Sequence, residues 1–120
     1  MNKEKDLKLR TKRFCIDCIR LAESLPNNYL GKHIQGQLIR SSSSVAANYR
    51  AANLAQSTAA FVSKISIVIE EADESQFWLE LIDNIQLINS EQRNILEKEA
   101  SELVAIFVSS RKKLHQRKFN

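Results

Sequence analysis

The cysteine and histidine side chains of this sequence could hold a metal ion or carry out redox chemistry. Cys15 and Cys18 form a Cys-x-x-Cys, but the chain has no second pair of cysteines. His33 and His115 lie at no recognised metal-ligand spacing. In a helix both thiols fall within an apolar stripe, which favours buried structural thiols over a redox or metal role. We predict no metal site and no cofactor.

A series of carboxylates between residues 70 and 83 raises the question of a catalytic or di-metal site. Di-metal sites in helical bundles use Glu-x-x-His pairs from more than one helix, and this chain has none. The acids fall mainly off the apolar seam, without an accompanying His or nucleophile, so general acid–base catalysis is unsupported. We predict no catalytic residue and expect a solvated face that pairs with neighbouring Lys or Arg. The residues are Glu70, Glu71, Asp73, Glu74, Glu80 and Asp83.

The basic residues offer a third kind of chemistry, the binding of a polyanion. The net charge of +4 conceals a basic start (residues 1–13), a basic end (residues 111–118) without any acid, and an acidic middle. Plain solubility or protein contacts would equally explain two basic ends, since no nucleic-acid motif or aromatic interleaving accompanies them. The candidate nucleic-acid-binding residues are Lys8, Arg10, Lys12, Arg13, Arg111, Lys112, Lys113, Arg117 and Lys118.

The composition limits what could position these residues. A chain of 120 residues with two Gly and one Pro is long enough for one domain, and lacks the turn residues of a many-stranded sheet. No apolar run approaches the roughly 20 residues that span a bilayer, and the start shows no signal peptide. We therefore expect a single all-α domain in the cytoplasm, without membrane contact.

Apolar residues recur at alternating steps of four and three, which predicts helices at about residues 6–24, 29–55, 58–88 and 91–115, followed by a basic tail at 116–120. Ser57 or Thr58 is expected to cap the third helix and Ser90 the fourth. Gly31 and Gly36 are expected to weaken the start of the second helix.

Small residues fill the middle of the second predicted helix, at residues 40–52. Four consecutive serines could form a flexible linker, but the apolar rhythm continues through them, which favours a close helix–helix contact. Asn48 falls on the inward seam, where it would either fix the register of the bundle or point to its edge.

The third predicted helix carries a second apolar stripe, at Trp78, Leu81, Ile85 and Ile88. A helix with two stripes is either deeply buried or in contact with another subunit. We favour the subunit contact, with Trp78, Leu81 and Ile85 as candidate interface residues of a homo-oligomer.

Four amphipathic helices with short connections predict an antiparallel up-down-up-down four-helix bundle. The start of the first helix and the end of the fourth then lie at the same end, so both basic segments would form one cationic patch. In a ring the patch would be repeated, which multiplies its attraction for a polyanion.

Three segments carry a resemblance to a known family: IRSSSSVAANY at residues 39–49, FVSKISI at 61–67 and EEADES at 70–75. They resemble the four-helix bundle family of 23S rRNA-intervening-sequence proteins, over nearly the whole chain. The resemblance implies a bacterial bundle usually assembled as a ring of five, without an established activity. A similar bundle, the accessory protein of diversity-generating retroelements, binds nucleic acid through a basic surface.

Two positions depart from the family pattern. Many members have a glutamate-glycine pair where this chain has Arg50 to Ala52, and a tryptophan where Arg10 stands. Roles of those family residues therefore do not carry over. The sequence favours an oligomeric bundle that binds RNA or DNA non-specifically through its basic ends, with an adaptor that mediates protein–protein contacts as the alternative.

Overall fold

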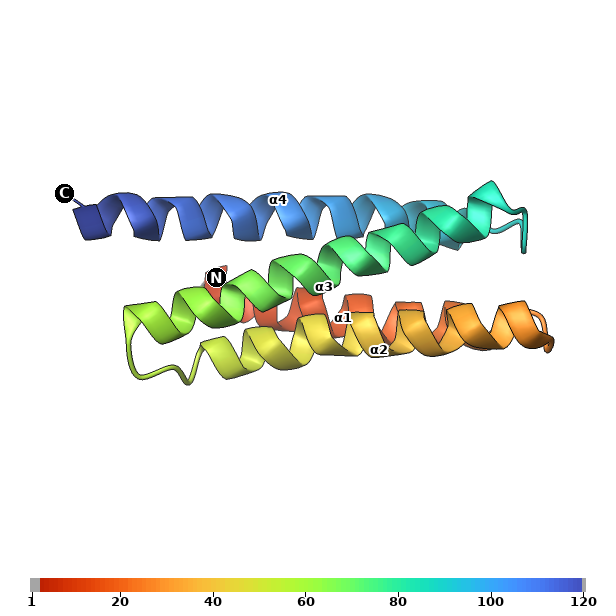
Figure 1. The fold of residues 1–120 in the computed structure, drawn as a ribbon, viewed down its shortest axis with the longest axis horizontal. Helices are drawn as coiled ribbons and strands as arrows, with labels where there is room; N and C mark the ends of the chain where they lie inside the picture. Colours follow the sequence, from red (N-terminus) through yellow and green to blue (C-terminus); the bar gives the residue numbers. More distant parts are fainter. Residues whose placement is uncertain (1–2, 120) are drawn as a thin grey trace.

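Four α-helices, each antiparallel to the next, form the bundle in Figure 1. Helix α1 packs on α2, α2 on α3 and α3 on α4, while a much smaller contact between α1 and α4 closes the bundle. The expected all-α, up-down-up-down fold is confirmed. The computed structural model describes the backbone of residues 3–119 and the side chains of residues 7–116. The helices are α1 (Lys3–Glu23), α2 (Tyr29–Ala52), α3 (Thr58–Asn84) and α4 (Glu91–Phe119).

Side-chain oxygens cap three helix starts. Asn28 Oδ1 accepts the backbone N–H of Gly31 at 2.8 Å, Ser57 Oγ accepts that of Ala60 at 3.1 Å, and Ser90 Oγ accepts that of Arg93 at 3.3 Å. Each bond satisfies one N–H that the first helical turn leaves without a partner. The caps predicted at Ser57 and Ser90 are confirmed.

Helix α3 ends at Asn84, four residues before its predicted end. Gln86 adopts a positive φ of 52° and its N–H donates to the carbonyl of Asp83, while the N–H of Leu87 donates to that of Ile82. This is the Schellman arrangement, in which Gly or Asn usually takes the left-handed position. Because Gln takes it here, no sequence signal marked the end. Ile88 therefore lies beyond α3, and the predicted second stripe stops at Ile85.

The other helix bounds also differ from the prediction. Helix α2 ends at Ala52 rather than residue 55, since Asn53 caps it with N–H bonds to two carbonyls of the last turn. Helix α4 continues to Phe119, so the predicted tail at 116–120 is wrong over the part that the structure describes. Gln, Arg and Lys are good helix formers, and no Gly or Pro interrupts them. Helix α1 begins at Lys3 rather than about residue 6.

The core contains the predicted apolar seams and three buried serines, Ser41, Ser42 and Ser75. Ser41 of α2 and Ser75 of α3 are completely buried, with their hydroxyl oxygens 2.9 Å apart. Small side chains allow two helices to approach closely, so the contact predicted for residues 40–52 lies between α2 and α3. The buried apolar side chains include Phe14, Cys18, Ile34, Leu38, Val45, Tyr49, Ile65, Val68, Leu79, Ile82, Leu103 and Phe107.

Two polar residues, Asn48 and Arg93, differ in their burial and in the helices that their hydrogen bonds connect. Asn48 is half-buried and donates to the carbonyl and hydroxyl oxygens of Ser44 in its own helix, so these two bonds join no second helix. Arg93 is buried instead, and its guanidinium donates to the carbonyl of Leu79 at 2.8 Å and to Glu97 at 2.6 Å. Arg93 thus fixes the start of α4 on α3 and contributes no surface charge. Within residues 3–119, no helix is both long and apolar enough to cross a bilayer.

Candidate nucleic-acid interface

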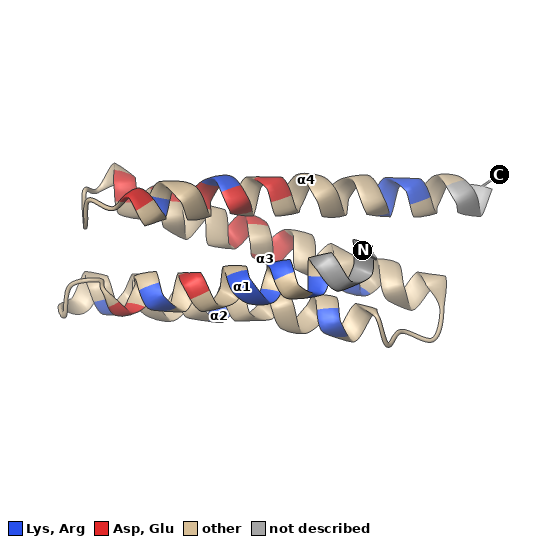
Figure 2. Cartoon of the chain, turned by 180° about the vertical axis from the view of Figure 1, so that it is seen from behind, with Lys and Arg blue, Asp and Glu red and all other residues tan. Residues whose placement is uncertain are grey.

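The two basic segments meet at one end of the bundle. A groove of about 480 Å³ is lined by Leu7 and Arg10 from the start of α1 and by Lys113 from the end of α4. Figure 2 shows Lys and Arg near the end of α4 and on the first turns of α1, at the same end. The antiparallel topology therefore brings together residues that are about a hundred positions apart in the sequence.

Arg10 is paired within the chain. Its Nε and Nη2 atoms lie 2.6 and 2.8 Å from the two carboxylate oxygens of Glu99, and Nη2 lies 2.5 Å from Glu102. The hydrogen bond to Glu99 outweighs the effect of burial and raises the pKa of Arg10 above its usual range. Because two carboxylates already neutralise it, Arg10 is the predicted cation least available to a ligand.

The other predicted cations vary in their surroundings. Lys8, Lys12, Arg13, Lys112 and Lys113 are exposed. Arg13, however, lines a second groove between α1 and α4, whose lining also includes Asp17, Glu99 and Glu102. Arg111 is half-buried and donates from Nη1 to Ser66 Oγ at 3.2 Å. The side chains of Arg117 and Lys118 lie outside the described residues.

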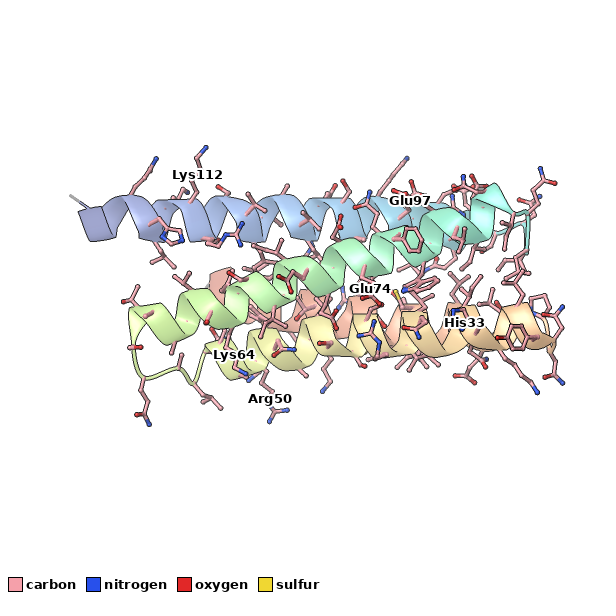
Figure 3. All side chains as sticks on the ribbon, in the orientation of Figure 1. His33, Arg50, Lys64, Glu74, Glu97 and Lys112 are labelled. Atoms are coloured by element: carbon pink, nitrogen blue, oxygen red, sulfur yellow. The ribbon has the colours of Figure 1, made fainter. Side chains whose placement is uncertain are left out.

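Sequence reasoning missed two further cations at this end, Arg50 and Lys64. Arg50 lies in the last turn of α2 and Lys64 in the second turn of α3, and Figure 3 places both at the same end as Lys112. The sequence does contain a signal for these cations, because no Asp or Glu occurs between residues 24 and 69 or after residue 102. We define the cationic end as Lys8, Arg50, Lys64, Arg111, Lys112 and Lys113.

Among the described side chains, the acids lie in the rest of the bundle. On α3 they begin at Glu70 and on α4 they end at Glu102, and Figure 2 shows both groups away from the cationic end. Some of them pair with neighbouring cations, as predicted: Arg40 of α2 binds Glu71 at 2.9 Å and also contacts Glu74. The charge of the protein is therefore divided along its long axis.

A third groove, of about 760 Å³, lies within the cationic end between α3 and α4. Leu114 and Val62 give it an apolar lining, and hydroxyl groups and an imidazole give it polar positions. Its lining includes Thr58, Val62, Ser63 and Ser66 from α3 and Leu114 and His115 from α4.

The candidate interface residues differ in exposure. Trp78 and Leu81 are half-buried and pack against the core, whereas Ile85 is 41% exposed. The Trp78 ring lies 5.7 Å from His33 of α2, and its Nε1 donates to Glu74 at 3.0 Å. The adjacent Phe77, which the sequence analysis missed, is 52% exposed.

A second apolar area lies on the opposite side of the bundle. Leu9 of α1 is 59% exposed and Ile95 of α4 is 52% exposed, and both line the groove between these helices. Leu9 stands between Lys8 and Arg10, off the main seam, and this position is the signal that could have identified it. The α1–α4 and α2–α3 seams face away from each other, because contacts follow the helix order around the bundle.

The cysteines show no sign of a reactive pair. Cys18 is completely buried and Cys15 is half-buried, and burial raises the pKa of both thiols. A thiol with a raised pKa holds less of the nucleophilic thiolate at neutral pH. Among the described residues, no three His, Cys, Asp or Glu side chains gather closely enough to hold a metal ion.

Comparison with known proteins identifies a matching family and similar solved structures. The sequence model of the 23S rRNA-intervening sequence protein family matches residues 3–109. A crystal structure from Bacteroides thetaiotaomicron, described as a protein of unknown function from the S23 ribosomal protein family, is similar with a TM-score of 0.82 and 30% identity. The match covers 92% of this chain and 99% of that one. No curated protein matches the chain.

Proposed function

This chain belongs to the 23S rRNA-intervening sequence protein family, and we propose that it binds RNA or DNA non-specifically through the cationic end of its bundle. The observation that carries the proposal is the separation of charge along the molecule. All four helices contribute a cation to one end, and no Asp or Glu occurs in the described residues 7–16, 24–69 or 103–116. Along these described residues, a polyanion would meet cations and no repelling carboxylate.

The available cations favour contact with phosphates. Lys8, Arg50, Lys112 and Lys113 are exposed and form no ion pair with a described side chain, in contrast with Arg10 and Arg40, whose carboxylate partners are neighbours in the fold. Their side chains leave the bundle in different directions, since Arg50 and Lys112 project from opposite sides in Figure 3. Such an arrangement suits a flexible backbone that follows the surface, and it carries no base-sequence information.

Replacing Arg111, Lys112 and Lys113 together by Ala is expected to weaken oligonucleotide binding by about tenfold at low salt. Each phosphate contact releases counterions, so the slope of log affinity against log salt should also become shallower. Fluorescence anisotropy with a labelled 20-nucleotide strand measures both quantities.

A variant that replaces Arg20, Lys32 and Lys98 by Ala is the matched control, because it lowers the net charge equally within the acidic part of the bundle. These three residues are exposed and form no ion pair with a described side chain. Its affinity should stay within about twofold of the wild type, since a screened surface charge acts mainly over a Debye length. Equal losses in both variants, or no binding of the wild type at low salt, would refute the proposal.

We propose in addition that the protein is a homo-oligomer, a ring of five in view of its family resemblance. The support is the presence of two different exposed apolar areas. One contains Phe77 of α3 and Ile85 directly after that helix, and the other contains Leu9 and Ile95 beside the α1–α4 groove. Contact between two different areas is head-to-tail, and such contacts close into rings when the rotation allows. The same areas would serve an adaptor that binds other proteins, which is the second candidate function.

Light scattering at micromolar concentration is expected to give a mass near five times the 13.7 kDa of one chain. Phe77→Glu should reduce that mass, because a buried carboxylate without a partner is unfavourable in an interface. Leu54→Glu is the control, since Leu54 is 78% exposed in the α2–α3 turn. A monomeric wild type would rule out the ring, and protein partners that survive nuclease treatment would favour the adaptor.

A further inference from the structure

The groove between α3 and α4 combines an apolar lining with a cationic rim. Val62 and Leu114 supply aliphatic carbon from the two helices, and Ser63 and Ser66 supply hydroxyl groups. His115, which is exposed, supplies the one aromatic ring of the lining. The volume of about 760 Å³ is of the size that holds a small organic group rather than a single ion.

Arg111 brings a cation to the edge of this groove, where its Nη1 donates to Ser66 Oγ at 3.2 Å. Lys112 follows Arg111 on α4. Among the described residues no Asp or Glu lines the groove, in contrast with the α1–α4 groove, which contains Asp17 and Glu99. An occupant should therefore have flat apolar faces, polar edges and attached negative charge.

We propose that this groove receives an unpaired base of a single-stranded nucleic acid, with the adjacent phosphates on Arg111 and Lys112. The inference rests on the proposed nucleic-acid binding and specifies its substrate class. A base offers a π-face to the His115 ring and to aliphatic carbon, and its edge groups can bond serine hydroxyls. A duplex would use only its phosphates here, because its bases are stacked inside and cannot enter a groove.

The test compares two strands of equal charge. A twelve-nucleotide thymidine strand is expected to bind about tenfold more tightly than a strand of the same length without bases, since stacking of one base supplies such a factor. Ala59 also lines the groove and is exposed, so Ala59→Leu should fill the groove without changing the charge. It should lower the affinity for the thymidine strand to that for the abasic strand and leave the latter unchanged.

A second variant separates loss of the groove from loss of the fold. His115→Ala should reduce the preference for the thymidine strand, while His33→Ala, which changes the other histidine at the α2–α3 seam, should retain it. Circular dichroism checks that each variant is helical. Equal affinity of both strands, or a preference that survives both groove variants, overturns the base site and leaves phosphate binding intact. Absence of binding to either strand at low salt overturns the proposed function itself.

Discussion

Replacing Gly31 by Ala is expected to lower the free energy of unfolding by about 3 kcal/mol, because the new methyl group meets backbone. A Cβ at this position would lie 1.9 Å from the carbonyl oxygen of Pro26 and 2.9 Å from its carbon. No side-chain rotation relieves this contact. The turn between α1 and α2 would have to move, and with it Asn28, whose side chain caps the Gly31 N–H at 2.8 Å.

Gly36 is the matched control on the same helix. A Cβ there meets nothing within 4 Å, so Gly36→Ala should raise stability by about 0.5–1 kcal/mol through the helix propensity alone. Urea denaturation followed by circular dichroism measures both variants. If Gly31→Ala is as stable as the wild type, the close approach of Pro26 is not a constraint on this turn.

Replacing Ser75 by Leu is expected to lower the unfolding free energy by a similar amount, about 3 kcal/mol. Ser75 is completely buried where α3 approaches α2, and its hydroxyl oxygen lies 2.9 Å from that of Ser41 and 2.8 Å from the carbonyl of Glu71. A branched side chain would push the helices apart along their largest contact. It would also leave the Ser41 hydroxyl with only a long bond of 3.4 Å to Leu38.

Two controls distinguish overpacking from the loss of a hydrogen bond. Ser75→Ala removes the hydroxyl without adding volume and should lower stability by about 1 kcal/mol. Ser101→Leu makes the same chemical change at an exposed position of α4, where it should alter stability by less than about 0.5 kcal/mol. Thermal denaturation of the three variants gives the order of their stabilities. A Ser75→Leu protein as stable as Ser75→Ala would contradict the close contact between α2 and α3.

The sequence predicted the bundle because its strongest signals are local. Apolar spacing identified the four helices, and Ser57 and Ser90 marked two starts. The small residues at 40–52 indicated a close contact, though not that Ser75 would meet Ser41. The end of α3 escaped prediction because Gln86 occupies a left-handed position that Gly usually takes. The sequence predicted only that Gly31 weakens the start of the second helix. The path of the preceding turn in the structure shows why a side chain is excluded there.

The candidate site was predicted less completely, because its geometry depends on contacts between distant residues. Topology alone placed both basic segments at one end. The pairing of Arg10 with Glu99 depends on the register of α1 against α4, which periodicity does not fix. Arg50 and Lys64 lie far from both basic termini in the sequence, so the charge of the termini alone does not reveal them. The stretch without Asp or Glu from residue 24 to 69 does indicate them. The α3–α4 groove arises from how two helix ends diverge, and no motif encodes that.

The division of charge along the bundle gives each protomer a large electric dipole moment. In a ring whose protomers all point the same way, these dipoles lie side by side and repel one another. A polyanion bound across the cationic ends would remove part of that repulsion. By thermodynamic linkage, assembly would then strengthen ligand binding and the ligand would strengthen assembly by the same factor. Added salt would act on the two processes in opposite directions, favouring the ring while releasing the nucleic acid.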